Sequence, residues 1–122
     1  MRNQHTTWDR KKFSAFLVNK KGCSTVVGSN YISRCLRVER ALKIDLLDAA
    51  KTVDEYLVLN SNLCKYAEKN SRDIKSSRVL IRTLRAAVKS FIEFRSASVA
   101  KKLPRFYGGK VIASNESKSQ AN

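Results

Sequence analysis

The stretch KSSRVLIRTLRAAVKSFI, residues 75–92, carries two kinds of side chain at helical spacing and decides the fold. Steps of three and four residues keep side chains on one face of an α-helix. The apolar side chains share one face, and they are Leu80, Ile81, Leu84, Val88, Phe91 and Ile92. The cations share the opposite face, and they are Lys75, Arg78, Arg82, Arg85 and Lys89. The stretch therefore predicts a long helix that packs against a core and presents a row of cations to solvent.

Three further helices are predicted upstream of this one from the same periodicity, so the expected fold class is all-α. The four predicted helices span residues 8–21, 25–42, about 54–69 and about 76–97. The expected N-caps are the polar residues ahead of these helices: Thr6 or Thr7, then Ser24, then Thr52 or Asp54, and last Ser76 or Ser77. Gly22 is expected to end the first helix.

Two segments lie outside the four helices. Residues 43–50 connect the second helix to the third and can form a short helical turn. Residues 98–122 lose the helical period and end in small polar side chains, so they are expected to form a basic, flexible and partly disordered tail behind the helical domain of residues 1–97. Within this tail, only residues 109–113 alternate as a strand does.

Length and composition favour one soluble domain. At 122 residues the chain can build a single core, and its 43% hydrophobic content excludes general disorder. No apolar run approaches the roughly 18–20 residues that span a bilayer, and the N-terminus lacks the apolar segment of a signal peptide. A cytoplasmic location without membrane contact is therefore expected, with Cys23, Cys35 and Cys64 reduced. Cys35 and Cys64 fall on apolar helix faces, whereas Cys23 falls in a turn.

The charge is strongly basic and unevenly distributed. The net charge is +15, yet residues 44–70 carry a net charge of −2 while every other segment is positive. Surface helices that form salt bridges usually alternate in sign, but no acidic residue lies between Ser76 and Phe91. A protein polarised in this way can turn one side to phosphates, so a nucleic acid is the expected partner.

Catalytic chemistry has little support in the residues. His5 is the only histidine, and the three cysteines have no spacing typical of a zinc site. The carboxylates cluster in residues 44–70, where a helix-capping or solubilising role suits Asp45 and Asp48 better than acid–base work. We therefore expect no enzymatic activity, no cofactor and no metal.

One more pattern lies in KFSAFLVNKKGCSTVVGSNYISRCLRVERAL, residues 12–42. An aromatic helix ends in a Lys-Gly-x-Ser turn, and a helix that begins with Ser/Thr and contains a Tyr follows. The matching residues are Phe13, Phe16, Leu17, Lys21, Gly22, Ser24, Thr25, Val26 and Tyr31. The fourth helix adds an apolar pattern of Leu80, Leu84, Ala87, Val88, Phe91 and Phe94. Over roughly residues 8–97 the chain thus resembles the SAM-like core-binding domain of tyrosine recombinases, the phage integrase family.

This resemblance implies a SAM-like, orthogonal four-helix bundle that forms half of a clamp around duplex DNA. It also implies that the second and fourth helices approach the major groove. The family's catalytic Arg, Lys, His-x-x-Arg and Tyr have no counterparts here, and Tyr107 lacks the arginines that would activate it. The expected function is that of a stand-alone, nucleoid-associated protein that binds double-stranded DNA and regulates transcription or recombination on a mobile element.

The candidate DNA-binding residues come from the two basic helices and their flanks. They are Lys20, Lys21, Arg34, Arg37, Arg40, Lys75, Arg78, Arg82, Arg85, Lys89, Lys101, Lys102 and Arg105. Two alternatives stay open: an inhibitor or interaction module whose basic face binds an acidic protein, and an RNA-binding protein. The sequence also leaves open whether Phe106 and Tyr107 pack against the helices or bind a partner.

Overall fold

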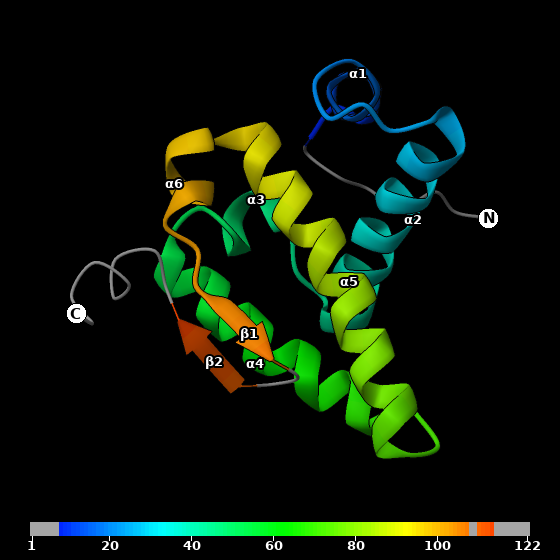
Figure 1. Cartoon of the computed structure of the whole chain (residues 1–122), viewed down its shortest axis with the longest axis vertical. Coiled ribbons are helices and arrows are strands. Elements are labelled where there is room, and N and C mark those ends of the chain that lie inside the picture. The colour runs from blue at the N-terminus through cyan, green and yellow to red at the C-terminus, as the bar shows by residue number, and fades with distance from the viewer. Residues whose placement is uncertain (1–7, 108–109, 114–122) are drawn as a thin grey trace.

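The computed structural model describes residues 8–107 and 110–113, which form a bundle of helices followed by a short β-hairpin (Figure 1). The helices are α1 (Arg10–Asn19), α2 (Thr25–Leu42), α3 (Leu46–Ala49), α4 (Val53–Lys69), α5 (Ile74–Arg95) and α6 (Ala97–Lys101). The strands β1 (Arg105–Tyr107) and β2 (Lys110–Ala113) pair antiparallel, and their register is irregular between Arg105 and Phe106. The predicted, mostly helical character is confirmed, and β2 lies where the sequence shows strand-like alternation.

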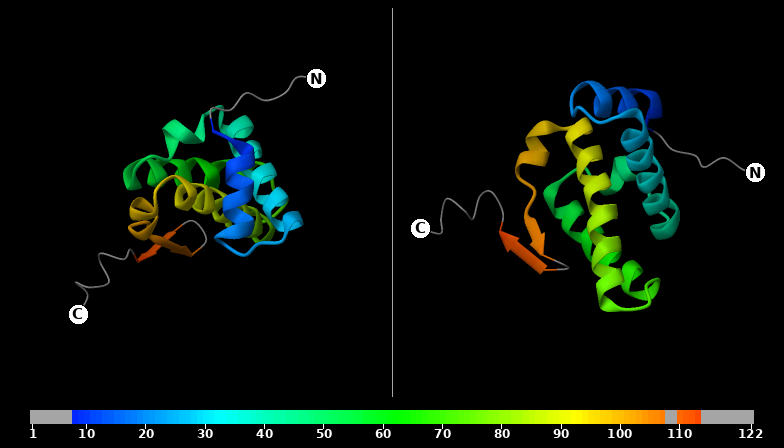
Figure 2. Two further views of the ribbon diagram at one scale, coloured as in Figure 1. Left: turned by 90° about the horizontal axis from the view of Figure 1, so that it is seen from above. Right: turned by 45° about the vertical axis from the view of Figure 1, so that its right-hand side comes forward.

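The centre of the bundle is α5, which packs against α2 on one side and α4 on the other. α1 contacts both α2 and α5, and in Figure 1 it is seen nearly end-on above them. Figure 2 shows this arrangement from two further sides, with α6 folded back against α5. The largest fully buried side chains come from these elements and from α3: Tyr56, Phe13, Phe91, Leu17, Leu46, Leu63, Leu84, Ile92, Val38, Val88 and Cys35.

Two of the predicted N-caps are confirmed. The hydroxyl of Ser24 accepts the backbone N–H of Val27 at 3.2 Å and begins α2. Thr52 and Glu55 form a capping box at the start of α4, in which each side chain accepts the other's backbone N–H. Both helices therefore begin where their apolar period and a capping side chain coincide.

The other two predicted caps are wrong by a few residues. The cap of α1 is Asp9, whose carboxylate accepts the backbone N–H groups of Lys11 and Lys12; the predicted Thr6 and Thr7 lie outside the described residues. The cap of α5 is Asp73 rather than Ser76 or Ser77, because its carboxylate accepts the backbone N–H of Ser76 at 2.8 Å. This bond lowers the pKa of Asp73 below its usual value. In both cases a carboxylate lies closer to the helix start, and an aspartate is among the best capping residues.

The end of the long helix also differs from the prediction. α5 stops at Arg95, and Ser96 then caps α6 by accepting the backbone N–H of Val99 at 3.3 Å. The expected loss of structure after Ala97 is therefore wrong for the residues that follow directly, and Leu103 is buried in the core. The disorder expected of the last dozen residues is wrong for residues 111–113, which belong to a β-strand, and residues 114–122 lie outside the described part of the chain.

The connections between the first helices behave largely as predicted. Gly22 lies just beyond the end of α1 with a φ of +73°, a left-handed conformation that favours glycine. α3 is the short helical turn expected within residues 43–50, and Asp45 caps it. Of the two roles left open for Asp45, the structure shows helix capping.

A buried carboxylate joins the N-terminal segment to the bundle. Glu39, on α2, is only 4% exposed, and its Oε2 accepts the indole N–H of Trp8 at 2.9 Å. The same oxygen accepts the backbone N–H of Leu46 at 2.9 Å. One side chain therefore holds the segment ahead of α1, the body of α2 and the start of α3 together.

Cys35 is the most buried of the three cysteines, whereas Cys23 and Cys64 are both half-buried, and their expected reactivity follows from burial together with thiol pKa. Cys35 is fully buried with its Sγ 3.3 Å from the carbonyl oxygen of Ala87, and burial raises the pKa of its thiol. Cys64, expected on an apolar face, is only half-buried, and desolvation raises the pKa of its thiol. Because the thiolate is the reacting species, timed alkylation with peptide mass spectrometry should label Cys23 first, then Cys64, and Cys35 last. Equal, rapid labelling of all three would contradict these helix registers.

Candidate nucleic-acid interface

The exposed face of α5 carries four of the five predicted cations. Lys75, Arg78, Arg82 and Lys89 are all exposed. At 3.6 residues per turn these positions fall within a sector of about 60°, and the 14 steps from Lys75 to Lys89 span about 21 Å. None of the four forms an ion pair with any other residue that the structure describes. The row is therefore a continuous strip of uncompensated positive charge.

Arg85, the fifth predicted cation, does not belong to this strip. It is half-buried, and its Nε donates a hydrogen bond to Oδ1 of Asn60 on α4 at 2.8 Å. Its position is about 80° around the helix from Lys75, at the edge of the apolar face. Burial lowers the pKa of Arg85, while Tyr56 and Cys64 act in the opposite direction. The prediction that Arg85 is exposed beside Arg82 is therefore wrong.

An ion pair ends the strip at its C-terminal side. Glu93 lies one helical turn beyond Lys89 and pairs with Nζ of Lys21, from the turn that connects α1 to α2. Lys21, a predicted DNA-binding residue, is thus already held by a carboxylate. Its neighbour Lys20 is exposed at the end of α1.

The arginines of α2 are arranged differently from those of α5. The Arg34 guanidinium lies 6.0 Å from the ring centre of Tyr31. Arg37 contacts Tyr66 of α4 twice, through an Nε–H bond of 3.1 Å to the phenol oxygen and a guanidinium 5.6 Å from the ring centre. Arg40 is exposed in the last turn of α2.

The two basic rows point in different directions. The thiol of Cys35 marks the side of α5 that faces α2, because it contacts the carbonyl of Ala87. Ala87 lies about 140° around α5 from Arg82, so the exposed cations of α5 face away from α2. On α4, the Arg37 partner Tyr66 and the Arg85 partner Asn60 are six residues apart, which places them about 120° apart around that helix. α2 and α5 therefore contact α4 on different sides, and the exposed strip of α5 is separate from the arginines of α2.

The remaining predicted residues lie near the C-terminal end. Lys101 and Lys102 are exposed at the end of α6. Arg105 belongs to β1, and its side chain is outside the described part of the structure. Of the two aromatic residues left open by the sequence, Phe106 and Tyr107, only the backbone is described, and it forms β1.

A hollow between α2 and α4 contains basic residues that the sequence did not single out. It has a volume of about 660 Å³, and Lys65, Tyr66 and Lys69 of α4 line it. These lysines were not predicted as binding residues because residues 44–70 have a negative net charge, although the C-terminal half of α4 contains two lysines. The i,i+4 spacing of Lys65 and Lys69 places both side chains on one helix face, and this pattern could have identified them from the sequence.

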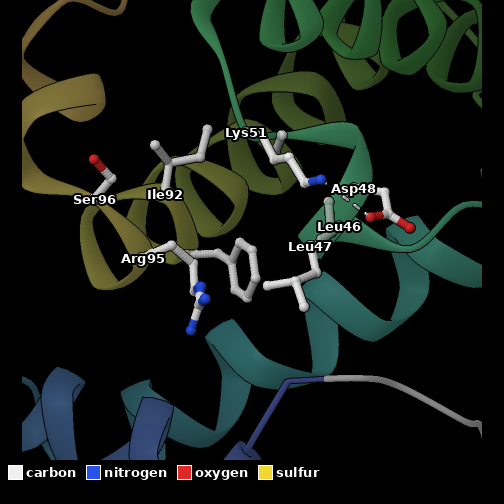
Figure 3. Close-up of a pocket in the computed structure, with 9 residues that line it drawn as sticks. Leu46, Leu47, Asp48, Lys51, Ile92, Arg95 and Ser96 are labelled. Atoms are coloured by element: carbon white, nitrogen blue, oxygen red, sulfur yellow. Dashed lines mark ion pairs between the residues drawn. The ribbon is translucent and has the colours of Figure 1, made fainter.

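A second hollow, of about 360 Å³, lies between α3 and the C-terminal end of α5 (Figure 3). Leu46 and Ile92 contribute apolar surface, and Lys51 and Arg95 are the cations around it. Lys51 is paired with Asp48 at 3.6 Å. Within residues 8–107 and 110–113, no three His, Cys, Asp or Glu side chains gather where they could hold a metal ion.

Comparison with protein-family models finds no match, and neither does comparison with curated proteins or with solved structures. Among the helices that the structure describes, none is both long and apolar enough to cross a membrane.

Proposed function

We propose that this protein is a non-catalytic binder of double-stranded DNA that uses the exposed face of α5. The observation that carries this proposal is the strip formed by Lys75, Arg78, Arg82 and Lys89, which has no ion-pair partner among the described residues. Like charges one turn apart repel one another by a few tenths of a kcal/mol. A phosphate backbone would neutralise this repulsion and release its own counterions.

A duplex suits this face better than a single strand. Proteins that bind single strands stack bases on exposed aromatic rings. Across residues 8–104 the large apolar side chains that are exposed are aliphatic, such as Val26, Val58 and Val79, and every aromatic ring is buried or half-buried. The strip therefore offers charge without stacking surfaces.

The resemblance to the core-binding domain of tyrosine recombinases extends this proposal. Helices near the expected positions, with Ser24 and Thr52 as caps, are compatible with a SAM-like bundle. If the resemblance holds for function, the protein is a nucleoid-associated DNA-binding protein that regulates transcription or recombination on a mobile element. The face on α5 is the one that the resemblance assigns to DNA contact, together with α2.

The test is a mobility-shift titration with one short duplex across a salt series. Four phosphate contacts predict a slope of log K against log salt of roughly −3 to −4. Replacing Arg82 and Lys89 together by alanine should flatten this slope by about two units, because two contacts are lost. Circular dichroism should show an intact fold, since both side chains are exposed.

The matched control removes the same charge elsewhere. Lys11 and Lys12 are exposed on α1, so their double alanine variant has the same net charge as the α5 variant. The Lys11/Lys12 variant should keep the wild-type salt slope, because the proposed phosphate contacts lie on α5 and do not depend on net charge alone. A wild-type slope and affinity for the Arg82/Lys89 variant would contradict the proposal. The basic face would then be assigned to an acidic protein partner, which a salt-sensitive pull-down can seek.

A further inference from the structure

The hollow between the C-terminal halves of α2 and α4, called the groove below, combines apolar surface with exposed cations. Ala41 and Leu42 of α2 provide apolar surface on one side, and Lys65 and Lys69 of α4 provide cations on the other. Both lysines are exposed, and neither forms an ion pair within the part of the chain that the structure describes. Because they are four residues apart on one helix, their ammonium groups repel each other unless an anion lies between them.

A third cation is fixed beside this groove. Tyr66 lines the groove, and its ring and phenol oxygen hold the Arg37 guanidinium through the two contacts described above. A guanidinium that is already ordered loses less conformational entropy on binding than a flexible lysine does. Asn62 and Asn70 add amide groups at the groove, although Asn70 already donates to the carbonyl oxygen of Tyr66 at 2.8 Å. Cations, an ordered guanidinium and an amide are the groups that bind phosphodiester oxygens.

The groove and the α5 strip lie on different sides of α4. The Arg37–Tyr66 contact and the Arg85–Asn60 contact lie about 120° apart around α4. Lys65 and Lys69, which line the groove, lie about 140° and 180° around α4 from Asn60, so the groove opens away from the side of α4 that contacts α5. An anion bound in the groove would lie on a different flank of the molecule from one bound to α5.

We propose that the groove binds the phosphodiester backbone of a second nucleic-acid segment, so that one chain bridges two duplexes. This inference rests on the proposed function of the α5 face, because bridging needs both surfaces. It adds an activity that single-duplex binding does not include. The groove would take the backbone of any sequence, since the groups that line it contact phosphates rather than base edges.

The test is a capture assay run beside the single-duplex titration. One duplex is immobilised on beads, and a fluorescent duplex of the same sequence is captured through the full-length protein. The groove variant, with Lys65 and Lys69 both replaced by alanine, should bind one duplex within about threefold of wild type but capture roughly tenfold less of the second. The charge-matched Lys11/Lys12 variant should capture as the wild type does. Alanine at these exposed helical positions should leave the circular dichroism unchanged.

Each other outcome overturns the inference. If the groove variant captures the second duplex as well as the wild type, bridging runs through another surface or through self-association. If the variant loses single-duplex affinity as strongly as the Arg82/Lys89 variant, the groove and α5 hold the same duplex. If the wild type shifts one duplex but captures no second one, the bridging inference fails while the proposed function stands. If no duplex is shifted at all, the proposed function itself has failed.

Discussion

Replacing Glu39 by alanine is expected to lower the free energy of unfolding by about 2–6 kcal/mol, which is a large share of the stability of a domain this size. The carboxylate accepts hydrogen bonds from the indole N–H of Trp8 and the backbone N–H of Leu46, both in the buried interior. Each donor left without an acceptor costs about 1–3 kcal/mol, and two are left here. Urea unfolding followed by Trp8 fluorescence measures the loss, because Trp8 is the single tryptophan of the chain.

The control for this prediction is glutamine at position 39. Its side-chain oxygen can accept the same two hydrogen bonds without the charge, so Glu39→Gln should lose less than half as much stability as Glu39→Ala. Both variants should unfold in one cooperative transition. Equal stability of the alanine variant and the wild type would show that Glu39 does not hold Trp8 and α3 together.

The second large effect is expected at Phe91, where alanine should cost about 3–5 kcal/mol. Phe91 is 1% exposed, and its ring lies 5.2 Å from that of Trp8 and 5.6 Å from that of Phe13. The Phe13 contact is perpendicular, a favoured geometry for aromatic pairs. Phe13 of α1 and Trp8 of the N-terminal segment both pack against this ring, so its removal loses both contacts. Tm should therefore fall together with the free energy of unfolding.

Leucine at position 91 separates ring packing from simple volume. Phe91→Leu keeps most of the buried apolar surface and should cost clearly less than Phe91→Ala. Both variants should lose near-ultraviolet circular dichroism, because that signal depends on ordered contacts between aromatic rings. An unchanged near-ultraviolet spectrum in the alanine variant would contradict the ring cluster described here.

The helices that follow strong periodicity could be predicted from the sequence. α2 begins at the predicted residue and α4 within one residue of it, because Ser24 and Thr52 cap them directly ahead of an apolar repeat. The cap of α5 was predicted wrongly because serines at 76 and 77 are also good caps, and only the geometry shows that the Asp73 carboxylate accepts the backbone N–H of Ser76. α6 could not be predicted because five residues are too few to show a helical period of apolar side chains.

The candidate interface could be predicted only in part. The spacing of Lys75, Arg78, Arg82 and Lys89 was sufficient, since helical geometry alone places these residues on one exposed face. Arg85 fits the same spacing rule, yet Asn60 of another helix supplies an acceptor and draws it inward. Whether two basic helices share one surface depends on how they pack against α4, and no local pattern encodes that arrangement.

The charge distribution along α4 has a consequence for the helix itself. Asp54 and Glu55 occupy its first turn and Lys69 its last, which is the arrangement that complements the helix macrodipole. Lys69 is therefore favourable where it stands even without a ligand, by about 0.3–1 kcal/mol. A glutamate at position 69 would destabilise the helix and remove a positive charge from the groove, whereas an arginine would preserve both the helix and the charge. The stability of α4 therefore favours a lysine or an arginine at position 69 whether or not an anion binds in the groove.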